Sequence, residues 1–192
     1  MPIIVTGVGS SGTSMIAGIL HKLGVSMGYT WRHVPPEGDK VWHRYEDTDF
    51  VFMNLLFAIK APEKVIIDAL RYLVRCKREP FGFKDPHISM NIPIYRKAIP
   101  DARWIWCTRN KKAIMDSLKR NWKMNFAKAI LYTEGRIQRL KKYLPKDHYV
   151  ARYEKFLKSP IVEVTKLADW LGVRLTQDAI DMVNKNVTNR ST

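Results

Sequence analysis

The chain has 192 residues, of which 46% are hydrophobic, and a formal net charge of +15. This length is sufficient for one domain with a full core. The positive charge indicates anionic partners, such as phosphorylated cofactors, acidic glycans, nucleic acid or a membrane surface. The only cysteines are Cys76 and Cys107, which excludes a disulfide framework or a cysteine metal cluster. No apolar run reaches transmembrane length, and we expect a cytoplasmic protein.

A strand, a glycine-rich loop and a helix are predicted at the start of the chain. Residues 3–5 form a β-branched apolar run that is typical of a buried parallel strand. Small residues follow over 7–14, and apolar residues then recur at helical spacing over 15–23, with Gly24 placed as a C-cap. Glycines let backbone N–H groups approach an anion, and a helix N-terminus adds unpaired N–H groups and partial positive charge. The unit therefore predicts a phosphate-binding loop.

The spacing of this loop fits the phosphate-loop pattern G-x-x-x-x-G-K-[ST], with Thr13 in the position of the lysine. Nucleoside-triphosphate enzymes use that lysine on the β- and γ-phosphates. Its replacement argues against an ordinary ATPase or kinase and leaves a loop that can hold a different phosphate. The hydroxyls of Thr13 and Ser14 add further donors.

The rest of the chain alternates helices with short strands. The predicted elements are a long loop over 26–39, a helix over 50–59 opened by the acidic residues of 45–49, a helix that starts at Pro62 and ends in the basic run 75–78, a strand over 81–84, a helix over 87–99, a strand over 102–107, a helix over 111–122, a further helix ending near Tyr143, a strand over 148–153, and helices over 161–171 and 177–186. Alternating strands and helices predict an α/β fold of three layers, α/β/α, around a central parallel sheet, in a single domain over residues 1–192.

Ligands of such sheets bind at the carboxyl ends of the strands, so the residues that follow each strand are candidates for a site. Arg109 follows the strand at 102–107, and Ser117 lies eight residues further on, about two helical turns along. An arginine offers a planar fork for phosphate oxygens and a serine offers a hydroxyl. Combined with the first loop, the pair predicts a second phosphate contact at the same edge.

Together these motifs resemble the sulfotransferases that use 3′-phosphoadenosine-5′-phosphosulfate (PAPS). The run Ser11-Gly12-Thr13-Ser14 resembles their 5′-phosphosulfate loop, [KR]-S-G-T-[ST], with Ser10 in place of the lysine or arginine. Arg109 and Ser117 resemble their 3′-phosphate pair, with Lys111 where a proline is usual. Shorter matches are Tyr45-Glu46-Asp47, Phe83-Lys84-Asp85-Pro86-His87, and the segment from Tyr153-Glu154 to Trp170-Leu171-Gly172, which we interpret as mainly structural.

The resemblance implies a fold like that of P-loop nucleoside-triphosphate hydrolases and transfer of a sulfuryl group from PAPS to a hydroxyl or amine, with no metal. The cofactor-binding residues that it implies are Gly9, Ser10, Ser11, Gly12, Thr13 and Ser14 for the 5′-phosphosulfate, and Arg109 and Ser117 for the 3′-phosphate. The acceptor is then a small molecule or a glycan, and the basic charge suits an acidic one.

Two catalytic roles follow from the resemblance. Glu46 is the expected base that takes the proton of the acceptor. Lys84 follows a predicted strand at the same edge, and we expect it to supply the cation that is missing at Ser10. Structural roles stay open for both, with Glu46 as a helix cap and Lys84 as the partner of Asp85 or another carboxylate. The alternative bases are His33, His43, Asp85 and His87.

Two other functions compete with this one. A nucleotide or small-molecule kinase with a degenerate phosphate loop would share the fold and bind ATP with Mg²⁺. A basic protein without enzyme activity could bind nucleic acid through the lysines and arginines of 109–142, between which Trp122, Phe126 and Tyr132 are interleaved. We expect instead that this stretch is a solvated face whose aromatic side chains pack inward, and we do not expect nucleic acid as the partner.

Overall fold

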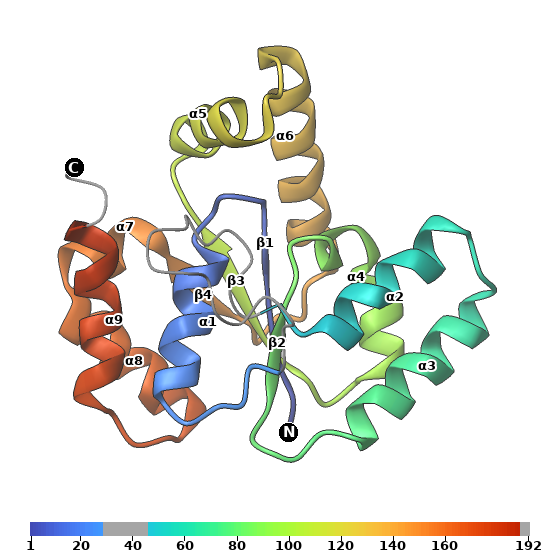
Figure 1. Cartoon of the computed structure of the whole chain (residues 1–192), viewed down its shortest axis with the longest axis horizontal. Coiled ribbons are helices and arrows are strands. Elements are labelled where there is room, and N and C mark those ends of the chain that lie inside the picture. Colours follow the sequence, from blue (N-terminus) through green and yellow to red (C-terminus); the bar gives the residue numbers. More distant parts are fainter. Residues whose placement is uncertain (29–45, 189–192) are drawn as a thin grey trace.

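The computed structural model describes residues 1–28 and 46–188, and a parallel sheet of four strands lies at the centre of this part (Figure 1). The strands lie in the order β2-β1-β3-β4. Their bounds are β1 (Ile3–Gly7), β2 (Gly82–Lys84), β3 (Arg103–Thr108) and β4 (Tyr149–Arg152). All three neighbouring pairs are parallel, which confirms the predicted sheet. The central β1 therefore ends between the carboxyl ends of β2 and β3.

Helices cover both faces of the sheet and form the two outer layers of an α/β/α fold (Figure 1). One layer contains α1 (Thr13–Lys22), α8 (Pro160–Leu171) and α9 (Gln177–Thr188). The other contains α2 (Thr48–Ala58), α3 (Glu63–Arg75), α4 (Ile88–Ala98), α5 (Lys111–Trp122) and α6 (Phe126–Tyr143). Val5 packs in the hydrophobic core under the first layer, and Ile4 packs in the core under the second. The two neighbours separate in this way because successive residues of a strand face opposite sides of the sheet.

One predicted helix forms with a kink, and one predicted strand is followed by a helix that was not predicted. The helix expected over 87–99 forms as α4 despite Pro93, because the backbone leaves helical geometry at Asn91 (φ −127°, ψ 20°) and the helix is kinked there. The strand expected over 148–153 ends at Arg152, and a short helix that was not predicted, α7 (Tyr153–Lys158), follows directly. With six residues, α7 is too short to give a helical pattern in the sequence.

Helices α5 and α6 form a hairpin that extends past the carboxyl ends of the strands (Figure 1). The side chain of Asn110 caps α5 by accepting from the Ala113 N–H, and that of Asn125 caps α6 by accepting from the Lys128 N–H. Lys123 ends α5 in the left-handed conformation, with φ 50°. The turn between the helices is therefore short, and Trp122 lies at the last helical position before it.

Candidate active site

The loop between β1 and α1 has the close backbone packing that a phosphate-binding loop requires. Two of its residues, Ser10 (φ 70°) and Gly12 (φ 96°), adopt the left-handed conformation. A Cβ atom on Gly12 would lie 2.5 Å from Cδ2 of Tyr153, and one on Gly7 would lie 2.7 Å from the carbonyl oxygen of Cys107. Glycine is therefore needed at both positions, at Gly12 for its backbone conformation as well.

Several donors of this loop have no partner among the described residues. The Ser11 N–H donates to the Val8 carbonyl at 3.0 Å, which closes the turn. The N–H groups of Gly12, Thr13 and Ser14 at the start of α1 donate to no other described residue. The hydroxyl of Ser11 is buried and likewise has no described partner. These groups suit an anion with several acceptor oxygens, so the residues present fit a phosphate or phosphosulfate group.

Lys84 and Glu46 meet at the mouth of this loop. Lys84 is the last residue of β2, and its Nζ lies 2.5 Å from Oε1 of Glu46 and 3.3 Å from the hydroxyl of Ser14. Only 1% of the Lys84 side chain is exposed, against 17% of Glu46. An ammonium group so deeply buried needs a negative partner. The structure therefore brings the two predicted catalytic residues together beside the loop, and the carboxylate paired with Lys84 is that of Glu46 rather than of Asp85.

Asp85 stabilises the turn after β2. Its carboxylate accepts from the His87 N–H at 2.7 Å and from the Asn54 side chain at 2.8 Å, and it lies 3.0 Å from Nδ1 of His87. Burial alone would raise the pKa of the Asp85 carboxyl, but the hydrogen bonds and charge of His87, with the bond from Asn54, hold this pKa below its usual value. Of the other alternative bases, His87 is half exposed, and His33 and His43 lie outside the described residues.

Arg109 lies against the phosphate loop from the opposite side, after β3. Its Nη1 donates to the Ser10 carbonyl at 3.1 Å, and its guanidinium lies 4.7 Å from the centre of the Tyr153 ring. Oε1 of Glu154 accepts from the Asn110 N–H at 2.8 Å, which fixes the backbone next to Arg109. Glu154 is exposed and holds the residue that caps α5.

Ser117, the second residue predicted to bind the 3′-phosphate, lies on α5. Its side chain is 6% exposed, and its hydroxyl accepts from Nδ2 of Asn121 at 2.9 Å. The hydroxyl proton is thus directed away from Asn121 and is available to a further acceptor.

Two aromatic residues that the sequence did not assign to the site lie beside the phosphate loop. A Cβ atom on Gly9 would lie 3.4 Å from Cη2 of Trp122 and 3.0 Å from the hydroxyl of Tyr132. The two rings are 5.8 Å apart, with an angle of 59° between their planes. Trp122 is 39% exposed, and Phe126 nearby is 59% exposed. The prediction that the aromatic side chains of this stretch pack inward is therefore wrong for these two. In the sequence, only the position of these aromatics within a basic run indicated that they could belong to a site.

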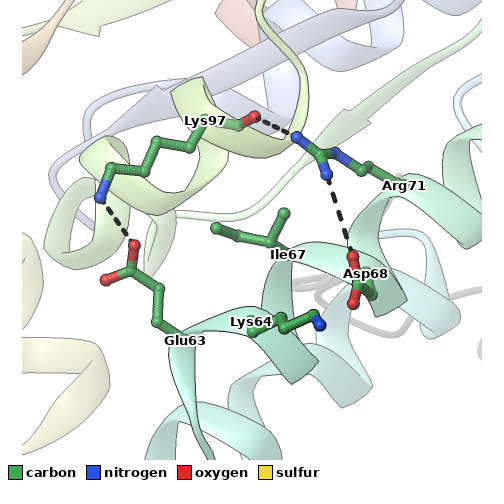
Figure 2. A pocket seen from close by; sticks show the side chains of 6 residues that line it. All are labelled: Glu63, Lys64, Ile67, Asp68, Arg71 and Lys97. Carbon is green, nitrogen blue, oxygen red and sulfur yellow. Dashed lines mark hydrogen bonds and ion pairs between the residues drawn. The ribbon is translucent and has the colours of Figure 1, made fainter.

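A separate surface hollow of about 520 Å³ lies between α3 and α4 (Figure 2). Its charges already pair with one another, since Lys97 binds Glu63 at 2.7 Å and Arg71 donates to the Lys97 carbonyl at 3.3 Å. Helix α4 runs back from the end of β2 to the start of β3. Lys97, near the end of α4, therefore lies at the amino ends of the strands, at the opposite edge of the sheet from the phosphate loop. None of the predicted site residues lines this hollow.

The described residues contain neither a metal-binding cluster nor a membrane-spanning helix. Residues 1–28 and 46–188 contain no group of three or more His, Cys, Asp and Glu side chains placed to hold a metal ion. No helix in the same part of the chain has the length and apolar character needed to cross a membrane.

Comparison with solved structures shows the fold. The chain is similar to sulfotransferase STF9 from Mycobacterium avium, with 16% identity and a TM-score of 0.64 over 100% of this chain and 68% of that one. It is also similar to the sulfotransferase domain of the Synechococcus PCC 7002 olefin synthase, with 22% identity and a TM-score of 0.56 over 93% and 76% of the two chains. A third similar structure is retinol dehydratase in complex with retinol and PAP, with 15% identity and a TM-score of 0.50 over 97% and 64%. These likenesses confirm the α/β fold of sulfotransferases, which is like that of P-loop nucleoside-triphosphate hydrolases.

Sequence comparison identifies the family. No curated protein sequence matches the chain significantly. The model of the sulfotransferase family, however, matches residues 2–178, which is nearly the whole chain. The match includes the phosphate loop, Lys84 and the stretch from Arg109 to Ser117. The chain therefore belongs to the sulfotransferase family.

Proposed function

We propose that this protein transfers a sulfuryl group from PAPS to a hydroxyl or amine acceptor. The observation that carries the proposal is the meeting of Lys84, Glu46 and the hydroxyl of Ser14 at the mouth of a phosphate loop with unused donors. This arrangement combines an anion site, a cation and a carboxylate, which are the three groups that sulfuryl transfer requires. The similar structure of retinol dehydratase holds PAP, which is adenosine 3′,5′-bisphosphate, and this supports a 3′-phosphoadenosine donor.

The donor would be held at both of its phosphate groups. The N–H groups of Gly12 to Ser14 and the Ser11 hydroxyl would bind the 5′-phosphosulfate, with the positive end of α1 behind them. Arg109 and Ser117 would bind the 3′-phosphate, the first through its planar guanidinium and the second through its hydroxyl. Arg109 already donates to the Ser10 carbonyl, so its position is coupled to the shape of the loop. Gly9 and Ser10 would contribute backbone only.

Lys84 would replace the cation that sulfotransferases carry in the loop itself. Its buried ammonium group lies 3.3 Å from the Ser14 hydroxyl, next to the N–H groups that would hold the phosphosulfate. From there Lys84 would stabilise the negative charge that develops on the oxygen bridging sulfur and phosphorus. Charge stabilisation of this kind, in a site closed to water, is commonly the largest contribution to catalysis.

Glu46 would take the proton of the acceptor. As the acceptor oxygen or nitrogen forms its bond to sulfur, the bond from sulfur to the bridging oxygen breaks, and the pair of electrons stays on the 5′-phosphate. The acceptor proton passes to Glu46, and Lys84 compensates the charge of the departing phosphate. Without a donor, the two side chains neutralise each other at 2.5 Å. Donor binding would therefore draw Lys84 towards the bridging oxygen and leave Glu46 available as a base.

The test is direct detection of sulfuryl transfer. Purified protein is incubated with PAPS labelled in the sulfuryl group and a panel of phenols, alkyl alcohols, amines and oligosaccharides, and labelled products are separated and counted. Transfer to at least one class that is lost in Lys84→Met and Glu46→Gln supports the proposal. The kinase alternative predicts instead that label from [γ-³²P]ATP with Mg²⁺, and none from PAPS, reaches an acceptor.

A further inference from the structure

We propose that the turn of the α5–α6 hairpin binds the acceptor and that it selects an acidic glycan. We call this surface the hairpin tip and define it as Lys119, Trp122, Lys123 and Phe126. The inference rests on the proposed function, because it names the acceptor of the same site. Three observations on the described residues carry it.

The hairpin tip is continuous with the phosphate loop. The indole of Trp122 lies so close to Gly9 that a Cβ atom there would be 3.4 Å from both Cη2 and Cζ2. With Tyr132 it forms an aromatic corner at the loop, while 39% of Trp122 remains exposed. A ring that stacks on the open part of this indole would lie next to the loop that holds the sulfuryl donor.

The basic side chains of the hairpin tip lie next to its aromatic rings. Lys119 is one helical turn before Trp122 on α5, so the two side chains share a face of the helix. The Lys119 ammonium lies 5.9 Å from the centre of the Phe126 ring, and Phe126 is 59% exposed. Lys123 follows Trp122 directly, ends α5 and is exposed.

The positive charge of the hairpin tip is not compensated within the described structure. The hairpin, residues 111–143, carries ten lysines and arginines but only two acidic residues, Asp116 and Glu134. Asp116 pairs with Lys112 at 3.1 Å, and Glu134 pairs with Lys111 at 2.5 Å. Lys119 and Lys123 form no ion pair with another described residue. An anionic ligand could therefore bind them without first displacing a carboxylate.

The chemistry of an acidic glycan matches these groups. The apolar faces of its pyranose rings can stack on Trp122 and Phe126, and its carboxylates or sulfates can pair with Lys119 and Lys123. Each ring also presents hydroxyl groups, which are the acceptors that sulfuryl transfer needs. The footprint of two exposed rings and two cations suits a few sugar units, whereas a typical nucleic-acid site neutralises more phosphates, roughly six to ten.

The experiment measures binding of a hyaluronan octasaccharide to the full chain saturated with PAP, by isothermal titration calorimetry. Maltooctaose serves as the neutral glycan, and oligothymidylate of equal charge as the nucleic acid. The variants are Lys119→Gln/Lys123→Gln, Trp122→Ala and Trp122→Phe. The matched control is Lys141→Gln/Lys142→Gln, which removes the same charge at the other end of α6.

We expect hyaluronan to bind in preference to maltooctaose and oligothymidylate. The double variant at the tip and Trp122→Ala should each weaken binding by about tenfold. Trp122→Phe should recover most of the affinity, and the control pair should change it by less than about twofold. The two lysine double variants, which leave the contact of Trp122 with Gly9 intact, should keep the thermal shift given by PAP, which reports the donor site alone.

Three results would overturn the inference. The first is a PAP shift without any binding of hyaluronan. The second is an equal loss in the control pair, which would indicate an effect of net charge. The third is tighter binding of oligothymidylate with the same dependence on the tip, which would assign the surface to nucleic acid. Failure of the proposed function itself is distinguishable, because PAP would then give no shift in the unaltered protein.

Discussion

The ammonium group of Lys84 lies 2.5 Å from the carboxylate of Glu46, although the two residues come from different elements. Lys84 ends β2, and Glu46 lies just before Asp47, the residue that caps α2. The packing of α2 on β2 holds them in place, since the rings of Phe50 and Phe83 stack with their centres 3.6 Å apart. This pair beside the phosphate loop is the geometric basis of the proposed chemistry.

Loss of the lysine charge should abolish most activity. In Lys84→Met the developing charge on the bridging oxygen has no cation, so we expect turnover to fall by about 10²–10³-fold. Glu46→Gln should lose about 10²–10⁴-fold, since the general base is removed. Steady-state assays with PAPS measure both. Turnover in Lys84→Met above half that of the unaltered protein would contradict the role of Lys84.

A lysine restored to the loop should rescue the loss at Lys84. In the Lys84→Met background, Ser10→Lys returns the cation to the position that other sulfotransferases use. The Ser10 carbonyl, which accepts from Arg109, is kept by the substitution. We expect a recovery of about tenfold or more in turnover, corresponding to about 1.4 kcal/mol of transition-state stabilisation. Ser10→Gln in the same background is the uncharged control. Equal turnover of these two double variants would show that charge at this position does not matter.

Glycines of the chain should differ sharply in their tolerance of alanine. Gly12→Ala places a Cβ atom 2.5 Å from the Tyr153 ring in a left-handed backbone, so we expect a loss of unfolding free energy of about 3 kcal/mol or more. Gly24→Ala has a similar φ of 89° but no atom within 4 Å, and should cost only about 1–2 kcal/mol. Gly135→Ala, within α6 and also unobstructed, should stabilise by about 1 kcal/mol.

Urea unfolding measures these three differences. The order of the variants is the critical result, because it separates steric contact from backbone strain and from helix propensity. Equal stability of Gly12→Ala and Gly24→Ala would mean that Tyr153 does not pack against the loop as described.

Asp85 should stabilise the fold in a manner that depends on pH. Its pKa is lowered in the folded protein, where the opposing effect of burial is outweighed by His87 and Asn54. A lowered folded pKa stabilises the protein above the pKa of the unfolded state, near 3.8, and this stabilisation is lost as the pH falls through the lower folded value. The difference in unfolding free energy between the unaltered protein and Asp85→Asn should therefore be larger at pH 6 than at pH 2.5. An equal difference at both values would contradict the lowered pKa.

The sequence was sufficient to predict the loop between β1 and α1 and the position of Arg109 at the same edge of the sheet, because both depend on local patterns. A glycine-rich stretch after an apolar strand specifies its own turn, and parallel strands bring their carboxyl ends to one edge. For the same reason Lys84 was expected at that edge. The identity of its partner depends on how α2 packs beside β2, which no spacing in the sequence encodes.

The aromatic corner at Gly9 could not be predicted for a related reason. Trp122 and Tyr132 reach the loop only because α5 and α6 fold back over the carboxyl ends of the strands, and that contact joins distant parts of the chain. In the sequence, exposed aromatics in a basic run look the same as aromatics of a buried helical face. Their exposure and their distance to Gly9 are properties of tertiary packing.

The most direct test of the account is thermal melting of the pure protein with and without PAP, in the presence of EDTA. At a hundred times its dissociation constant, PAP should stabilise the fold by about 2.7 kcal/mol, which is a shift of several degrees for a chain of this size. The shift should disappear in Arg109→Ala, measured against that variant's own melting temperature, and persist in Arg174→Ala, which removes an exposed arginine elsewhere. No shift with PAP, together with a shift by ATP and Mg²⁺, would contradict the sulfotransferase account and favour a kinase.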